Sequence, residues 1–76
     1  MNLQNPEIIA KIGAKLKRLR IEKGYTSYEN FAMDFDLSRA YYWKVERGQQ
    51  NLSMDYFLSL LKIHEISLKD FFSDID

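Results

Sequence analysis

The chain has no cysteine, which excludes disulfide bonds and thiolate metal sites and is typical of a reducing, cytoplasmic compartment. It also has a single histidine, His64, with no histidine or carboxylate cluster at metal-ligand spacing. We expect His64 at the edge of the core or on the surface. The sequence has no glycine-rich phosphate loop and no plausible set of nucleophile, base and acid, so we predict neither enzymatic activity nor a bound metal or cofactor.

Long apolar runs are absent too, and the first residues lack the cationic and apolar regions of a signal peptide, so we expect no membrane segment. The chain has 76 residues, the size of one small domain spanning 1–76, without room for a second catalytic or ligand-sensing domain. No small-molecule effector is evident.

The chain has no net charge, because its 11 Lys and Arg residues balance its 11 Asp and Glu residues. The distribution is nevertheless uneven: residues 1–48 have a net charge of +3 and residues 49–76 a net charge of −3. A nucleic-acid partner would favour the basic part, and we expect the acidic part to face away from it.

Apolar residues recur with helical spacing, and nothing alternates convincingly with period two. We therefore predict an all-α protein with helices at about 7–23, 27–35, 38–47, 53–63 and 67–73. The first helix follows Pro6 and stops at Gly24. The second has two possible caps, Thr26 and Ser27.

The most informative segment is the third helix, which Ser38 can cap and Gly48 can end. It is about three turns long, which suits the DNA major groove. If Tyr42 and Val45 face the core, five residues point outward: Arg39, Ala40, Trp43, Lys44 and Arg47. Cations and flat rings on such a face are typical of a nucleic-acid reader.

Several motifs recur in the order found in one family: an Arg four residues before Gly24, Phe31-Ala32 in the second helix, Leu37-Ser38-Arg39 opening the third, and Glu46-Arg47-Gly48 closing it. In these motifs the chain resembles the lambda repressor and Cro-like (XRE) helix-turn-helix family. The resemblance implies a five-helix DNA-binding transcriptional regulator that acts as a homodimer on an inverted-repeat site in double-stranded DNA. The length also resembles the stand-alone controller proteins of restriction-modification systems.

We predict base readout by Arg39, Ala40, Trp43 and Lys44, because Arg and Lys pair with guanine and a methyl group permits close approach. Trp43 has two open roles, contact with a thymine methyl or sugar and packing against the second helix. Phosphate contacts are predicted at Ser27, Tyr28, Ser38, Tyr41, Arg47, Gln50 and Asn51. Tyr28 stands where the family often has a phosphate-binding Gln, and Asp36 where the inter-helix turn usually has Gly.

The resemblance also implies a buried ion pair between Arg20 and Glu46 that ties the first helix to the third. In the last helix, Leu68 and Phe71 can face the core while the adjacent Phe72 points elsewhere, so Phe72 is predicted in a dimer interface. The remaining cations of the first helix are expected to form a solvated face, with direct phosphate contact as the alternative: Lys11, Lys15, Lys17, Arg18 and Lys23.

Two other functions stay open on the sequence alone. One is an antitoxin-like or other protein-interaction module that uses the same fold to hold a partner. The other is a degenerate domain that has lost its DNA affinity, which the neutral net charge makes conceivable.

Overall fold

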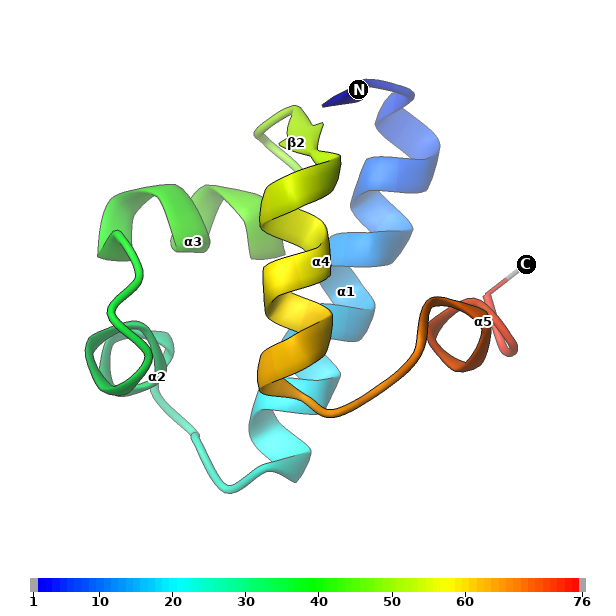
Figure 1. Cartoon of the computed structure of the whole chain (residues 1–76). Helices are drawn as coiled ribbons and strands as arrows, with labels where there is room; N and C mark the ends of the chain where they lie inside the picture. Colours follow the sequence, from blue (N-terminus) through cyan, green and yellow to red (C-terminus); the bar gives the residue numbers. More distant parts are fainter. Residues whose placement is uncertain (1, 76) are drawn as a thin grey trace.

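The computed structural model describes residues 2–75 and confirms an all-α fold of five helices (Figure 1). In chain order the elements are β1 (Asn2–Leu3), α1 (Pro6–Glu22), α2 (Tyr28–Asp34), α3 (Arg39–Glu46), β2 (Leu52–Ser53), α4 (Met54–Ile63) and α5 (Leu68–Phe71). β1 and β2 form an antiparallel pair with Asn2 opposite Ser53 and Leu3 opposite Leu52. The sequence did not predict this pair, because two-residue strands are too short to show an alternating pattern.

Side-chain caps define where the helices begin. Asn5 accepts hydrogen bonds from the backbone N–H groups of Glu7 and Ile8, at 3.0 and 3.1 Å, and Pro6 occupies the first helical position. The other helices of the described chain follow a serine whose hydroxyl accepts an N–H three residues on: Ser27 for α2, Ser38 for α3, Ser53 for α4 and Ser67 for α5. Ser27, and not Thr26, is therefore the cap of α2.

Two non-glycine residues have left-handed backbone conformations that let the chain turn between helices. Asp36 joins α2 to α3 with a φ of 56°, a region that Asp enters more readily than most residues. Glu65, with a φ of 54°, follows α4, and nothing in the local sequence indicated it. The departure of Asp36 from the usual glycine is therefore accommodated in the turn.

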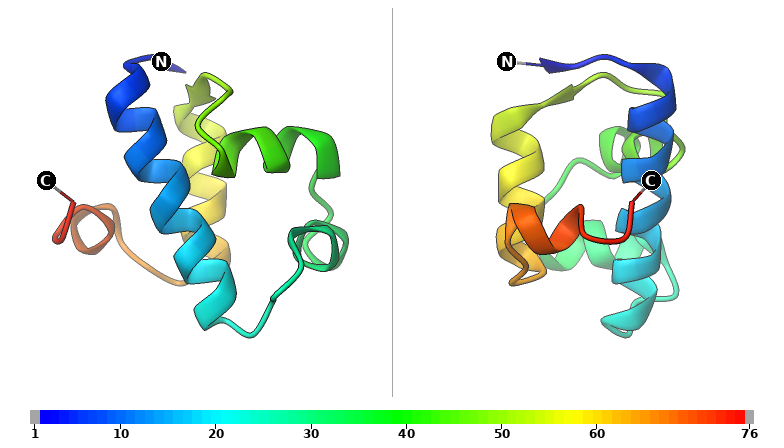
Figure 2. Two further views of the ribbon diagram at one scale, coloured as in Figure 1. Left: turned by 180° about the vertical axis from the view of Figure 1, so that it is seen from behind. Right: turned by 90° about the vertical axis from the view of Figure 1, so that its right-hand side faces the viewer.

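α1 and α4 form the centre of the molecule, with α2 and α3 on one side and α5 on the other (Figure 1). A second view shows α5 lying across the α1 and α4 pair (Figure 2). The apolar faces of these helices meet in one core, whose buried members are Ile12, Leu16, Phe31, Tyr42, Val45, Leu52, Phe57, Leu60, Leu61 and Phe71. On α1, Ile9 is buried, whereas the adjacent Ile8 is 45% exposed.

α1 and α3 cross very closely at Gly13. A Cβ atom on Gly13 would lie 2.5 Å from the carbonyl oxygen of Val45 and 2.6 Å from that of Glu46. Only a hydrogen fits in that space, so the glycine lets the end of α3 rest directly on α1. This contact fixes the position of the helix that carries the candidate site.

The last helix differs from the prediction in length and orientation. α5 ends at Phe71, and Leu68 is 44% exposed although we expected it to face the core. Phe71 takes the core position instead, and its ring packs edge-on against Phe57 at 5.1 Å. Phe72 is half-buried, with its ring 5.8 Å from that of Phe57. Phe72, which we expected to point away from the core, therefore packs against its edge.

Candidate nucleic-acid interface

The orientation of α3 follows the prediction. Tyr42 and Val45 are buried, and the backbone therefore turns the predicted reading face away from the core. Four residues of that face are exposed, namely Arg39, Ala40, Lys44 and Arg47, and Trp43 is half-buried. The five side chains thus border one surface.

Arg39 has a partner that sequence reasoning missed. Its guanidinium lies 3.6 Å from the carboxylate of Glu29 at the start of α2, and the two side chains are 69% and 54% exposed. Exposed pairs of this kind contribute about 0.2–1 kcal/mol. The contact is weak enough for Arg39 to exchange Glu29 for another acceptor.

Trp43 and Arg47 form a stacked pair on the outer side of α3. The Arg47 guanidinium carbon lies 4.5 Å from the centroid of the indole. Residues four apart on a helix are neighbours, so this contact could have been found from the spacing. It covers one face of Trp43 and leaves the guanidinium N–H edges available to an acceptor.

The loop after α3 is tied to the helix through Tyr41. The Tyr41 hydroxyl donates to the carbonyl oxygen of Asn51 at 3.4 Å, and its ring meets that of Tyr56 edge-on at 4.7 Å. Gln50 is half-buried and Asn51 is exposed in this loop. The predicted phosphate residues of the loop are therefore held near the end of α3.

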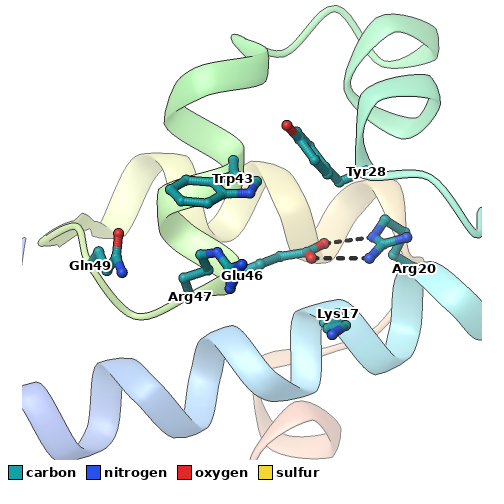
Figure 3. A pocket seen from close by; sticks show the side chains of 7 residues that line it. All are labelled: Lys17, Arg20, Tyr28, Trp43, Glu46, Arg47 and Gln49. Atoms are coloured by element: carbon teal, nitrogen blue, oxygen red, sulfur yellow. Dashed lines mark hydrogen bonds and ion pairs between the residues drawn. The ribbon is translucent and has the colours of Figure 1, made fainter.

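An open hollow of about 400 Å³ lies beside the reading face (Figure 3). Its walls come from α1, α2, α3 and the following loop: Lys17, Arg20, Tyr28, Trp43, Glu46, Arg47 and Gln49. Tyr28, a predicted phosphate residue, and Trp43 thus line the same hollow. Two further predicted phosphate residues, Ser27 and Ser38, already accept backbone N–H groups as helix caps.

Arg20 and Glu46 form the buried ion pair that the family resemblance implies. Arg20 donates to both carboxylate oxygens, from Nε at 2.8 Å and from Nη2 at 3.2 Å (Figure 3). It also donates to the carbonyl oxygen of Tyr25 at 2.8 Å, and the paired side chains are only 5% and 7% exposed. The hydrogen bond from Arg20 to Glu46 raises the pKa of the guanidinium. Burial raises the pKa of the neighbouring Tyr42 hydroxyl, with Glu46 adding to the effect.

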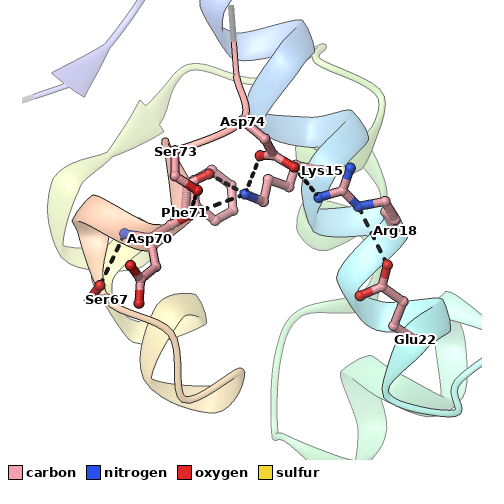
Figure 4. A network of polar contacts seen from close by, with 8 residues as sticks. All are labelled: Lys15, Arg18, Glu22, Ser67, Asp70, Phe71, Ser73 and Asp74. Carbon is pink, nitrogen blue, oxygen red and sulfur yellow. Dashed lines mark hydrogen bonds and ion pairs between the residues drawn. The ribbon is translucent and has the colours of Figure 1, made fainter.

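Lys15 contradicts the expected solvated face of α1. The side chain is 7% exposed, and its ammonium group donates to the carbonyl oxygen of Phe71 and to the carboxylate of Asp74, the latter at 2.6 Å (Figure 4). Arg18 reaches the same carboxylate at 3.0 Å. Hydrogen bonds from Lys15 and then Arg18 lower the pKa of Asp74. Lys15 is therefore an anchor for the residues after α5.

His64 lies at the edge of the core, where its ring stacks on Phe31 with centroids 5.3 Å apart. Burial lowers the pKa of His64, and nearby Lys23 acts in the same direction. Across residues 2–75 the side chains form no group of three or more potential metal ligands. Nor does that part of the chain contain a helix with the length and apolar character needed to cross a membrane.

The sequence pattern of the helix-turn-helix family matches residues 16–71. The control protein C.MunI of Mycoplasma sp is 42% identical over 73 residues, which cover 92% of this chain and 95% of that protein. The crystal structure of the restriction-modification controller protein C.AhdI from Aeromonas hydrophila superimposes with a TM-score of 0.74 at 36% identity, covering 87% of this chain and 98% of that one.

A further similar structure contains DNA. It is the restriction-modification controller protein C.Esp1396I, crystallised as a tetramer in complex with its natural 35 base-pair operator. The TM-score is 0.73 at 30% identity, over 87% of this chain and 86% of that chain.

Proposed function

This chain belongs to the helix-turn-helix family of lambda repressor and Cro-like proteins, and from that premise we propose that it is a transcriptional regulator that binds specific double-stranded DNA sequences through α3. The observation that carries the proposal is the α3 surface. Two buried residues, Tyr42 and Val45, pack a capped helix into the core while Arg39, Ala40 and Lys44 remain exposed. Arg39 and Lys44 then read base edges, and Ala40 permits close approach.

The partner is an inverted-repeat operator bound by a homodimer. The related protein C.Esp1396I assembles as a tetramer on its operator, which supports an oligomer here. Two copies related by a two-fold axis place two α3 helices in successive major grooves, about one helical turn apart. Phosphate contacts from residues around α3 set the register: Ser27, Tyr28, Ser38, Tyr41, Arg47, Gln50 and Asn51.

We further propose a controller role in a restriction-modification system, within the cytoplasm. Named relatives of comparable length are control proteins, and they cover most of this chain. In this role the protein would regulate transcription through its own concentration and dimerisation.

The proposal is tested by selecting bound sequences from a random duplex library at near-physiological salt. We expect enrichment of a symmetric inverted repeat. The affinity for the selected duplex should then fall with salt. The plot of log affinity against log salt concentration should have a slope of about −0.9 per neutralised phosphate, much shallower than the roughly −10 of a strongly basic repressor. A slope near zero, or a library without enrichment, would support the degenerate-domain or protein-interaction alternative.

A further inference from the structure

Lys17 stands apart from the other cations of α1. Within the part of the chain that the structure describes, each of the others is engaged by the protein: Lys11 with Glu7, Lys15 and Arg18 with Asp74, Arg20 with Glu46, and Lys23 over the ring of Phe35. Lys17 is exposed and has no recorded ion pair, hydrogen bond or ring contact in residues 2–75. Its charge is therefore not compensated by the fold.

The position of Lys17 brings that charge to the end of α3. Lys17 lies one turn after Gly13 on the face of α1 that rests on α3, since residues four apart share a helix face. In Figure 3 it lies across the hollow from Arg47 and Trp43. Besides Arg20, which is paired with Glu46, the hollow is thus lined by Lys17 from α1 and Arg47 from the C-terminal end of α3.

The electrostatics of the hollow favour an anion. The carboxylate of Glu46 also faces it, but both carboxylate oxygens accept from Arg20, so this pair has no net charge. Lys17 and Arg47 remain as uncompensated positive charges, and the Gln49 side chain adds an amide donor. Two cations and an amide donor are suited to the oxygens of a phosphodiester.

The hollow also continues the reading face, because Trp43 and Arg47 belong to both. A DNA strand bordering the major groove that α3 occupies would run past this side of the helix. We propose that the hollow binds one phosphate of the DNA backbone in each half-site, with Lys17 and Arg47 as its cationic ligands and Trp43 as a wall that holds Arg47 in place. This inference rests on the proposed DNA-binding function.

The first test compares Lys17→Gln with Lys62→Gln, because Lys62 is an exposed lysine of α4 outside the hollow. For the selected operator, Lys17→Gln should make the log–log salt slope shallower by about 0.9 per protomer, and Lys62→Gln should leave it unchanged. The affinity of Lys17→Gln should fall equally for the operator and for unrelated duplex, with the selected motif unchanged. Lys17→Arg should retain the parent slope.

The second test locates the phosphate. Operator duplexes with single neutral methylphosphonate linkages are titrated with the parent and with Lys17→Gln. One linkage per half-site should weaken the parent strongly and Lys17→Gln clearly less, because only Arg47 still contacts that phosphate in the variant. If the parent binds its operator and Lys17→Gln keeps its slope and its sensitivity to every linkage, the phosphate site is wrong while DNA binding stands. If the parent binds no duplex, the proposed function fails as well.

Discussion

Arg39 and Lys44 lie five residues apart on α3, and we predict that they read base edges while Arg47 contacts the DNA backbone. Arg39 makes only a weak, exposed contact with Glu29 of α2, whereas Arg47 is stacked on Trp43 beside the hollow. We therefore predict that Arg39 reaches a base edge and that Arg47 contacts a backbone phosphate. The two arginines of this surface should therefore behave differently when they are removed.

Arg39→Ala should cost about 1–3 kcal/mol of binding free energy on the best operator and relax the preference at one base position per half-site. Arg47→Ala is the matched control, which should weaken binding to all sequences and preserve the motif. Selection from a random library with each variant measures both effects. If Arg39→Ala returns the parent motif with unchanged information at every position, base readout belongs to Lys44 and Trp43 instead.

Gly13 is the residue on which the closeness of α1 and α3 depends. Gly13→Ala should lower the free energy of unfolding by about 1–3 kcal/mol, because the added methyl group must push apart two backbones already at contact distance. Helix propensity alone predicts the opposite, a gain of about 1 kcal/mol. Denaturant unfolding of the variant decides between them, and a more stable variant would show that the α1 to α3 spacing is adjustable.

At the scale of the elements, α3 is attached to α1 at two points. Gly13 supports its C-terminal end, and the Arg20–Glu46 ion pair joins the two helices beside the hollow. The same Arg20 also holds the turn after α1 through the carbonyl oxygen of Tyr25. One buried cation therefore fixes the relative placement of α1, α2 and α3.

Removing either Arg20 or Glu46 should lower the free energy of unfolding by about 3–5 kcal/mol, because the remaining partner is left charged in a buried site. Arg20→Ala and Glu46→Ala should each lower thermal stability far more than they change sequence preference, and a double-mutant cycle should show strong coupling. Glu22→Gln, which breaks an exposed contact with Arg18, is the control and should change stability by less than about 1 kcal/mol. A stable single variant that has lost DNA affinity would place the pair at the DNA surface.

At the scale of the whole molecule, the basic and acidic parts of the sequence occupy different parts of the fold. The acidic part of the sequence includes α4 and α5, and α5 lies on the side of the α1 and α4 pair opposite to α3, which carries the predicted reading face (Figure 1). One acidic residue, Asp74, is bound by Lys15 and Arg18 and so anchors the segment after α5 against α1. The surface of α5 thereby faces away from α3, and we predict that a second copy associates there without blocking the DNA.

Phe72→Ala should weaken the homodimer, because Phe72 is half-buried beside an exposed apolar residue, Leu68. Sedimentation of the variant against the parent measures the association. Leu68→Ala is the companion variant, since Leu68 is 44% exposed and its loss should leave the monomer folded. Met33→Ala, an exposed residue of α2, should change neither stability nor association. An unchanged association state in both α5 variants would remove this surface from the interface.

The local sequence was sufficient to predict features that depend only on residues close together in the chain, such as a helix cap, a turn and the buried face of a helix. Ser38 caps α3 as the sequence predicted, and Asp36 adopts the left-handed conformation that its turn requires. The burial of Tyr42 and Val45, and with it the outward face of α3, follows from helical periodicity. The Arg20–Glu46 pair is a contact 26 residues apart in sequence, and only the family resemblance indicated it.

What the sequence by itself determined is therefore the set of helices, the cap and the exposed face of α3, and the family. The tertiary structure decided which charges are free: it buried Lys15 against Phe71 and Asp74, 56 and 59 residues away, paired Arg39 with Glu29, and left Lys17 open beside Arg47. It also decided that Gly13 must be small and that Leu68 faces outward. The physical reason is that a charge or a side-chain volume acquires its role from atoms that only folding brings near, whereas caps and helical faces are set within a few residues of the chain.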